Sequence, residues 1–90
     1  FGLTRLFAVL EPLLPGSVSV SRISVQDIYK DGDKMNADLE FSVLSRDYQS
    51  VVTMIDNMNN SGIFQAELRG QDLQKTDRST YTEYTLRLIW

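Results

Sequence analysis

The sequence predicts an α+β fold in which two helices cover one face of a four-stranded antiparallel sheet. Apolar residues recur at helical spacing in two segments, and apolar and polar residues alternate in four others. Gly, Pro and Asp-Gly turn signals separate these segments. The chain has 90 residues, of which 42% are hydrophobic and 23% charged, so we expect a single domain over residues 1–90. It begins with Phe1 rather than Met, and we therefore expect it to be part of a longer protein.

The first helix is predicted near the start of the chain. Its apolar face, at helical spacing, consists of Leu3, Leu6, Phe7, Leu10 and Leu14. Pro12 lacks the backbone donor that a helix interior needs, so the regular helix should end near Leu10. Pro15-Gly16 then ends the segment.

A long β-hairpin is predicted next. Residues 17–29 are rich in β-branched side chains and alternate, but the alternation changes phase midway. A β-bulge near Ser21–Arg22 would return the apolar side chains to one face. Asp-Gly within residues 30–34 favours a tight connection. Residues 35–43 then form a strand with one apolar face and one wet face. The apolar face contains Met35, Ala37, Leu39, Phe41 and Val43, and the wet face contains Asn36, Asp38, Glu40 and Ser42.

The second helix is predicted to begin after an N-cap at Ser45 and to run to about Asn59. Asp47 in the first turn would favour the helix dipole. The apolar stripe consists of Tyr48, Val51, Val52, Ile55 and Met58. Gly62 should adopt the left-handed conformation that ends many helices. Asn59-Asn60-Ser61 also matches a glycosylation sequon, but we favour helix termination because the match is short and coincides with this stop.

Two further strands complete the pattern. Residues 64–68 alternate and form the third strand, and residues 70–80 are expected to form a charged, mobile loop. Residues 81–90 form the last strand. Its core face is predicted to contain Tyr84, Leu86, Leu88 and Trp90.

The order of elements is therefore helix, two strands, helix, two strands. A right-handed crossover through the second helix leaves a gap in the sheet that the last strand can fill. With strands numbered along the chain, the predicted sheet order is 3-4-2-1, which is a circularly permuted ferredoxin-like plait. This order places Asp38 or Glu40 beside Arg87 on the open face, as a cross-strand ion pair.

Composition excludes several classes of function. A net charge of −3 and a pI near 4.7 disfavour nucleic-acid binding, which needs a basic surface. The chain has no Cys and no His, so the commonest nucleophile, general base and metal ligands are missing, and we expect no catalytic residue, cofactor or metal. Asp31 and Asp33 flank a glycine, but the ligand spacing of a calcium loop is absent.

An acylphosphatase-type enzyme and an ACT-type regulatory domain are two other functions to consider for this fold. An acylphosphatase-type enzyme needs a Gly-rich phosphate loop before a helix, and residues 42–46 contain no glycine. A regulatory domain of the ACT type stays open as an alternative, because such domains bind small ligands through backbone groups at strand edges.

Four segments carry a resemblance to a known family: Leu14-Pro15, Val18 to Ile23, Met35 to Val43, and Asn60 to Phe64. They read as a helix ending in Leu-Pro, a strand of the type Pro-x-x-Val-x-Val-x-x-Ile, a second strand, and a helix closing in Asn-Ser-x-x-Phe. In this order they resemble the C-terminal domain of the type IV pilus assembly protein PilN, over nearly the whole chain. The related PilO, GspL and GspM domains, the last two from type II secretion, have a similar pattern.

The resemblance implies a non-enzymatic scaffold domain of the pilus inner-membrane alignment complex. It implies a periplasmic domain of a bacterial single-pass inner-membrane protein, with membrane contact only through a segment absent from this sequence. The implied partners are a PilO-like protein, a second copy, or both, and the parent protein would also bind a PilM-like cytoplasmic protein. The short N-terminal motif that binds PilM in the family is absent here.

The candidate interface is the edge of the first predicted strand. In the 3-4-2-1 order the first and third strands are edges with unpaired backbone groups. The first is long and β-branched, and few charges lie along it. The residues expected to contact a partner are Ser17, Val18, Ser19, Val20, Ser21 and Arg22.

Overall fold

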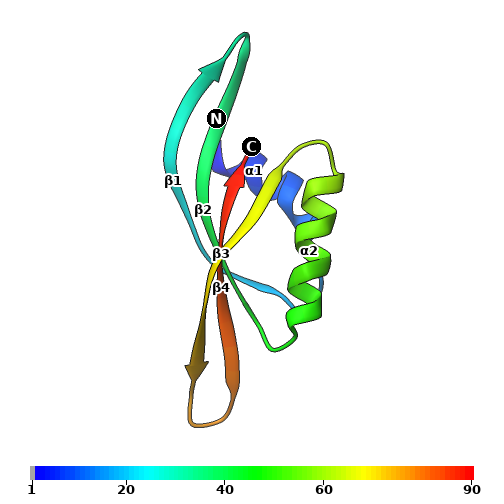
Figure 1. Ribbon diagram of the computed structural model, residues 1–90, viewed down its shortest axis with the longest axis vertical. Coiled ribbons are helices and arrows are strands. Elements are labelled where there is room, and N and C mark those ends of the chain that lie inside the picture. The colour runs from blue at the N-terminus through cyan, green and yellow to red at the C-terminus, as the bar shows by residue number, and fades with distance from the viewer. Residues whose placement is uncertain (1) are drawn as a thin grey trace.

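The computed structural model describes residues 2–90 and has the predicted order of helices and strands (Figure 1). The elements are α1 (Leu3–Leu10), a short 3-10 turn η1 (Glu11–Leu13), β1 (Ser19–Asp31), β2 (Lys34–Ser45), α2 (Tyr48–Asn60), β3 (Gln65–Lys75) and β4 (Thr80–Ile89). The sheet order is β1-β2-β4-β3, and every neighbouring pair is antiparallel. This confirms the predicted α+β fold and its 3-4-2-1 order.

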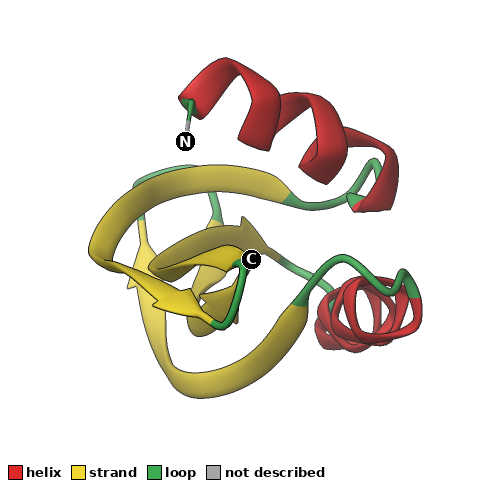
Figure 2. Cartoon of the chain, turned by 90° about the horizontal axis from the view of Figure 1, so that it is seen from above, coloured by secondary structure: helices red, strands yellow, loops and turns green. Residues whose placement is uncertain are grey.

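The core lies between the helices and one face of a strongly twisted sheet (Figure 2). At its centre β2 and β4 place large apolar side chains opposite one another, with Leu39 across from Leu88 and Phe41 across from Leu86. All four side chains are completely buried, as the alternation predicted. The helices contribute Leu6, Leu10, Val51, Met54 and Met58, and the remaining members are Val18, Ala37, Val43, Phe64 and Tyr84. Both helices therefore pack against the same buried face of the sheet.

Both helices bury a narrower face than the sequence predicted. In α1, Leu3 is 52% exposed and Phe7 is 45% exposed, because the helix makes contact mainly through Leu6 and Leu10. In α2, the buried residues are Val51, Met54 and Met58, so Met54 joins the core although the predicted stripe left it out, and Tyr48 is 54% exposed. The Tyr48 ring instead lies 6.0 Å from the ring of Tyr84, measured between centroids.

The N-cap of α2 is Asp47, not Ser45 as predicted. The Gln49 amide donates to Asp47 Oδ1 at 3.1 Å. Ser45 is still part of β2, where it pairs with Thr82, so its backbone is committed to the sheet. Gly62 has φ of 74° and Gly32, in the first hairpin, has φ of 64°, and both predicted left-handed turns are confirmed.

The predicted loop over residues 70–80 is wrong. Strand β3 continues to Lys75, and it pairs with β4 as far as Lys75 opposite Thr80, which leaves only residues 76–79 for the turn. The backbone of Thr76 donates to Ser79 across this turn at 2.8 Å. The polar composition misled the prediction because this part of the hairpin projects beyond the core, where neither face needs apolar side chains. The two hairpins extend in opposite directions along a molecule of 49 × 22 × 22 Å (Figure 1).

The predicted bulge in β1 is confirmed, and two others were not predicted. The register between β1 and β2 shifts between Val20 and Arg22 and again between Val25 and Asp27. A third shift lies in β3, between Leu68 and Gly70. The two bulges of β1 place Val20, Ile23, Val25 and Ile28 opposite core-face residues of β2.

Candidate protein interface

Strands β1 and β3 are the two edges of the sheet, as predicted. An edge strand presents unpaired N–H and C=O groups that can pair with another chain. What lies beside each strand decides whether these groups are available.

The β3 edge is occupied near its start by a side chain of α2. The Asn59 amide forms two hydrogen bonds with the backbone of Ala66: Ala66 N–H donates to Asn59 Oδ1 at 2.7 Å, and Asn59 Nδ2 donates to Ala66 C=O at 3.1 Å. The amide therefore acts like a peptide group of a neighbouring strand. Ala66 cannot pair with a further chain while these bonds are in place.

This pair also gives a role to the Asn-rich end of α2. Ser61 satisfies the helix end by donating from Oγ to the Met58 carbonyl at 2.7 Å, and its Oγ accepts from the Ile63 amide at 3.1 Å. Asn59, Ser61 and Gly62 together turn the chain from α2 into β3 and attach the two elements to each other. Asn59 and the Ser61-Gly62 turn thus both have a structural function.

The β1 edge carries the residues predicted as the interface. Ser17, Ser19, Ser21 and Arg22 are exposed, and Val20 is partly buried. Val18 is only 7% exposed and belongs to the core, so its side chain is turned away from any partner. The available surface at this point is therefore polar side chains and backbone.

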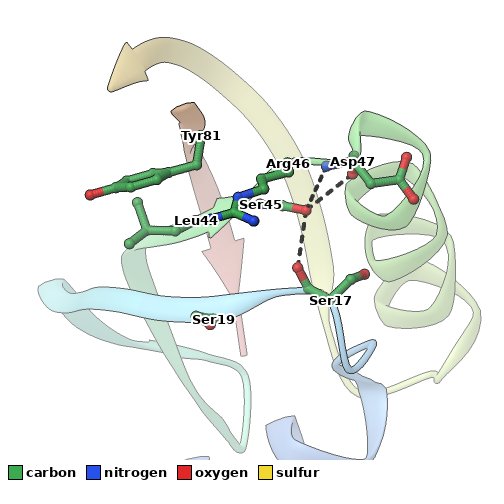
Figure 3. Close-up of a pocket in the computed structure, with 7 residues that line it drawn as sticks. All are labelled: Ser17, Ser19, Leu44, Ser45, Arg46, Asp47 and Tyr81. Carbon is green, nitrogen blue, oxygen red and sulfur yellow. Dashed lines mark hydrogen bonds between the residues drawn. The ribbon is translucent and has the colours of Figure 1, made fainter. Parts of the chain in front are cut away.

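A shallow hollow of about 440 Å³ lies beside the start of β1 (Figure 3). Its lining residues are Ser17, Ser19, Leu44, Ser45, Arg46, Asp47 and Tyr81. The buried hydroxyl of Ser45 lies 3.1 Å from the Ser17 carbonyl and accepts from the Asp47 amide at 3.1 Å. Ser17 Oγ also donates to Ser50 Oγ at 2.6 Å. These bonds join the start of β1 to the loop that leads into α2 and to the first turn of that helix.

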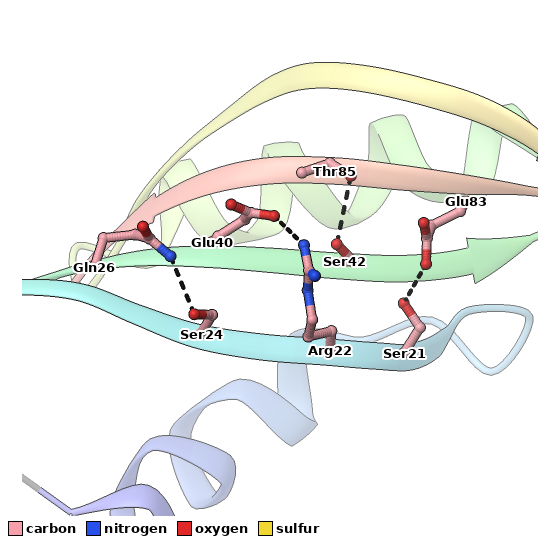
Figure 4. A network of polar contacts seen from close by, with 8 residues as sticks. All are labelled: Ser21, Arg22, Ser24, Gln26, Glu40, Ser42, Glu83 and Thr85. Atoms are coloured by element: carbon pink, nitrogen blue, oxygen red, sulfur yellow. Dashed lines mark hydrogen bonds and ion pairs between the residues drawn. The ribbon is translucent and has the colours of Figure 1, made fainter.

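The open face of the sheet is a polar surface with paired charges (Figure 4). Ser21 donates to Glu83 at 3.0 Å, and Arg22 forms an ion pair with Glu40. Farther along, Arg87 binds Asp38 with a closest N–O distance of 2.8 Å, which confirms the predicted cross-strand pair. The hydrogen bond to Asp38 and the charge of that carboxylate raise the pKa of Arg87 above its ordinary value. The open face is therefore polar, and two of its charged pairs join neighbouring strands.

Within residues 2–90, no three His, Cys, Asp or Glu side chains gather closely enough to hold a metal ion. No helix in this described range has both the length and the apolar character needed to cross a membrane.

Comparison with solved structures finds this fold in a pilus protein. The crystal structure of the type 4 fimbrial biogenesis protein PilO from Pseudomonas aeruginosa superimposes over 99% of this chain and 68% of its own, with a TM-score of 0.62 and 12% identity. The chain shares its fold with PilO. The core region of PilO from the type IV pilus system of the same organism superimposes over 98% of this chain and 89% of its own, with a TM-score of 0.55 and 13% identity.

The comparisons of sequence add no closer relative. No protein-family model matches the chain. No curated protein matches it either. The likeness to PilO therefore rests on the arrangement of helices and strands.

Sequence reasoning located the β1 edge but missed two features that distinguish it from β3. The bulge between Val25 and Asp27 had a signal in the sequence, because Val25 and Ile28 are three residues apart, which a regular alternating strand does not allow for one face. The bonds between Asn59 and Ala66 had no local signal, since they depend on how α2 packs beside β3.

Proposed function

We propose that this chain is a non-enzymatic assembly domain of the type IV pilus inner-membrane complex that acts through protein–protein contacts. The observation that carries the proposal is the PilO fold, which extends over 99% of the chain. The resemblance of four sequence segments to PilN points to the same complex. The absence of Cys and His from the sequence also agrees with a scaffold role.

Within that complex the domain is PilN-like and periplasmic, carried by a protein anchored in the inner membrane. Its partner is a PilO-like protein, a second copy of itself, or both. A domain that shares the fold of its partner can associate through equivalent edges, because each contributes the same row of backbone donors and acceptors. The β1 edge is the surface that we propose for this contact.

The experiment is co-expression of this chain with the PilO-like protein of the same genome, with an affinity tag on this chain only. Recovery of a stoichiometric complex supports the proposal, and its absence at high concentration contradicts it. Ser19→Pro and Ser21→Pro then test the surface, with circular dichroism to show that each variant is folded. A complex that persists in folded variants would show that another surface makes the contact.

A ligand-binding regulatory domain of the ACT type is the second candidate, because a hollow with polar and apolar lining residues lies beside Ser17 and Asp47. Thermal-shift screening with amino acids and nucleotides separates the two functions. A specific ligand that raises the unfolding temperature would favour the regulatory function.

A further inference from the structure

The central part of the open sheet face carries the excess negative charge of the chain. Six carboxylates lie there, at register positions on the side opposite the core: Asp27, Asp38, Glu40, Glu67, Asp72 and Glu83. The basic side chains of the same region are Arg22, Arg69 and Arg87. The difference equals the net charge of −3 of the whole chain, so the imbalance is concentrated on one face.

The arginines of this face already have partners. Each binds a carboxylate nearby, in the pairs Arg22–Glu40, Arg87–Asp38 and Arg69–Glu67. Asp27, Asp72 and Glu83 form no ion pair within residues 2–90. Glu83 accepts a hydrogen bond from Ser21 (Figure 4), and Asp72 accepts one from Gln74. These donors are neutral, so the negative charges of the three carboxylates stay uncompensated.

Two pairs of carboxylates also lie directly opposite one another on neighbouring strands. Asp27 of β1 is opposite Asp38 of β2, and Asp72 of β3 is opposite Glu83 of β4. Like charges in opposite positions destabilise a sheet. Arg87 binds only one member of the first pair, Asp38, and no arginine binds the second pair. Each pair therefore has a repulsion that a cationic group from outside the chain would relieve.

The two pairs lie toward opposite ends of the face. Asp38 is opposite Ile89, which is six residues from Glu83 along β4. With a rise of about 3.4 Å per residue, the pairs are about 20 Å apart. A partner that contacts both must present two groups of Lys or Arg side chains at about this separation.

The charge also restricts the kind of partner. A second copy of this chain would bring its own net negative face against the first, and like charges across an interface oppose association. Nucleic acid carries the same sign of charge and would be repelled too. A basic protein surface has the complementary charge.

We infer that the open face binds a basic surface of another protein, which places Lys or Arg side chains against the Asp27–Asp38 and Asp72–Glu83 pairs. The inference goes beyond the proposed function, because it concerns a different surface from the β1 edge. It does not depend on the pilus assignment.

Neutral variants test whether these pairs cost stability in the free chain. Asp27→Asn and Asp72→Asn should each raise the unfolding temperature at low salt, because each removes one repulsion, and the rise should shrink with added salt. Asp56→Asn is the matched control, since Asp56 is exposed on α2 and away from this face. A lower unfolding temperature in Asp27→Asn and Asp72→Asn would show that these carboxylates stabilise the fold, and would overturn the inference.

Peptide binding tests the contact itself, by fluorescence anisotropy. The probe is a fluorescent peptide with two Lys-Arg pairs separated by a neutral spacer of about six residues. Its control has the same composition with all basic residues adjacent. The spaced peptide should bind about fivefold more tightly than the control, and the double variant Asp27→Asn, Asp72→Asn should lose about tenfold in affinity for it. Asp56→Asn should bind it as the natural chain does. Equal binding of the two peptides, or an unchanged double variant, overturns the inference.

A small cation is the other possible occupant, and calcium chloride alone is the probe for it. In amide NMR spectra the spaced peptide should shift the signals of Asp27, Asp38, Asp72 and Glu83, and calcium should not. Calcium that produced the same shifts and displaced the peptide would assign the pairs to a divalent cation, which overturns the inference.

The two proposals can fail separately. A chain that binds the PilO-like protein but does not prefer the spaced peptide keeps the proposed function and loses the inference. A chain that prefers the spaced peptide but binds no PilO-like protein keeps the inference and loses the pilus assignment.

Discussion

The two edge strands, β1 and β3, belong to one sheet but differ in what lies beside them. Along β3 the side chain of Asn59 takes the hydrogen bonds of Ala66 that a neighbouring strand would use. Along β1 the corresponding surface holds exposed Ser, Arg and Val side chains, and two bulges set their directions. The difference is therefore local: a side chain at the end of α2 takes the outward backbone groups of one β3 residue, Ala66.

The largest effect we expect is the loss of unfolding free energy when a core side chain is removed, because both edge strands depend on the core. Phe41→Ala deletes a completely buried side chain at the centre of β2, which supports both edges through β1 and β4. The expected cost is about 3–5 kcal/mol of unfolding free energy, measured by urea denaturation. Met35→Ala on the same strand is the control, since Met35 is 61% exposed, and a similar loss there would contradict this placement of the core.

Removal of the side-chain amide of Asn59 should leave the outward backbone groups of Ala66 on the β3 edge without this partner. Asn59→Ala leaves the Ala66 N–H and C=O without these partners, at a cost of about 1–2 kcal/mol. The Ala66 amide should exchange with solvent faster, and the variant should self-associate more readily through β3. Asn60→Ala, one residue along the same helix end, controls for helix propensity. Unchanged exchange at Ala66 would show that Asn59 does not close this edge.

The start of β1 depends on the cap of α2, and this provides a smaller test. Asp47→Ala removes the bonds to the Gln49 amide and to Ser50 Oγ, and should cost about 1 kcal/mol. Because Ser50 also contacts Ser17, amide exchange at the start of β1 should rise as well. Asp47→Asn keeps an N-cap acceptor and should lose less. Equal losses in both variants would argue against the capping role.

The smallest effect should come from the ion pair on the open face, midway between the two edges. Arg87→Met removes the partner of Asp38, but the Arg87 side chain is exposed, so the change in unfolding temperature should be slight and should shrink with added salt. The raised pKa of Arg87 means that its contribution is complete below the usual arginine pKa and is lost only at higher pH. The difference between Arg87→Met and the natural chain should therefore be the same at neutral and mildly alkaline pH. A difference that vanished at mildly alkaline pH would contradict this.

The sequence predicted the parts of the fold where burial imposes a pattern. Strand residues 35–43 and 81–90 have one buried face, and their alternation was sufficient to place Leu39, Phe41, Leu86 and Leu88 in the core. The order of strands followed from the handedness of the crossover. The extension of β3 over residues 70–75 could not be predicted this way, because that part of the hairpin has no buried face.

The candidate interface was predictable only in part. Local composition identified the β1 edge, and the phase change near Ser21 identified its first bulge. The state of the β3 edge depends on a side chain from another element, which no local pattern records.

The most direct test of the account is amide hydrogen exchange of β1 and β3 as the concentration of the chain is raised. If β1 is the contact surface, its amides between Val20 and Ile28 should become protected with concentration, and those of β3 should not change. Protection that appears in β3 instead, or in neither strand while the chain is seen to associate, would contradict the account.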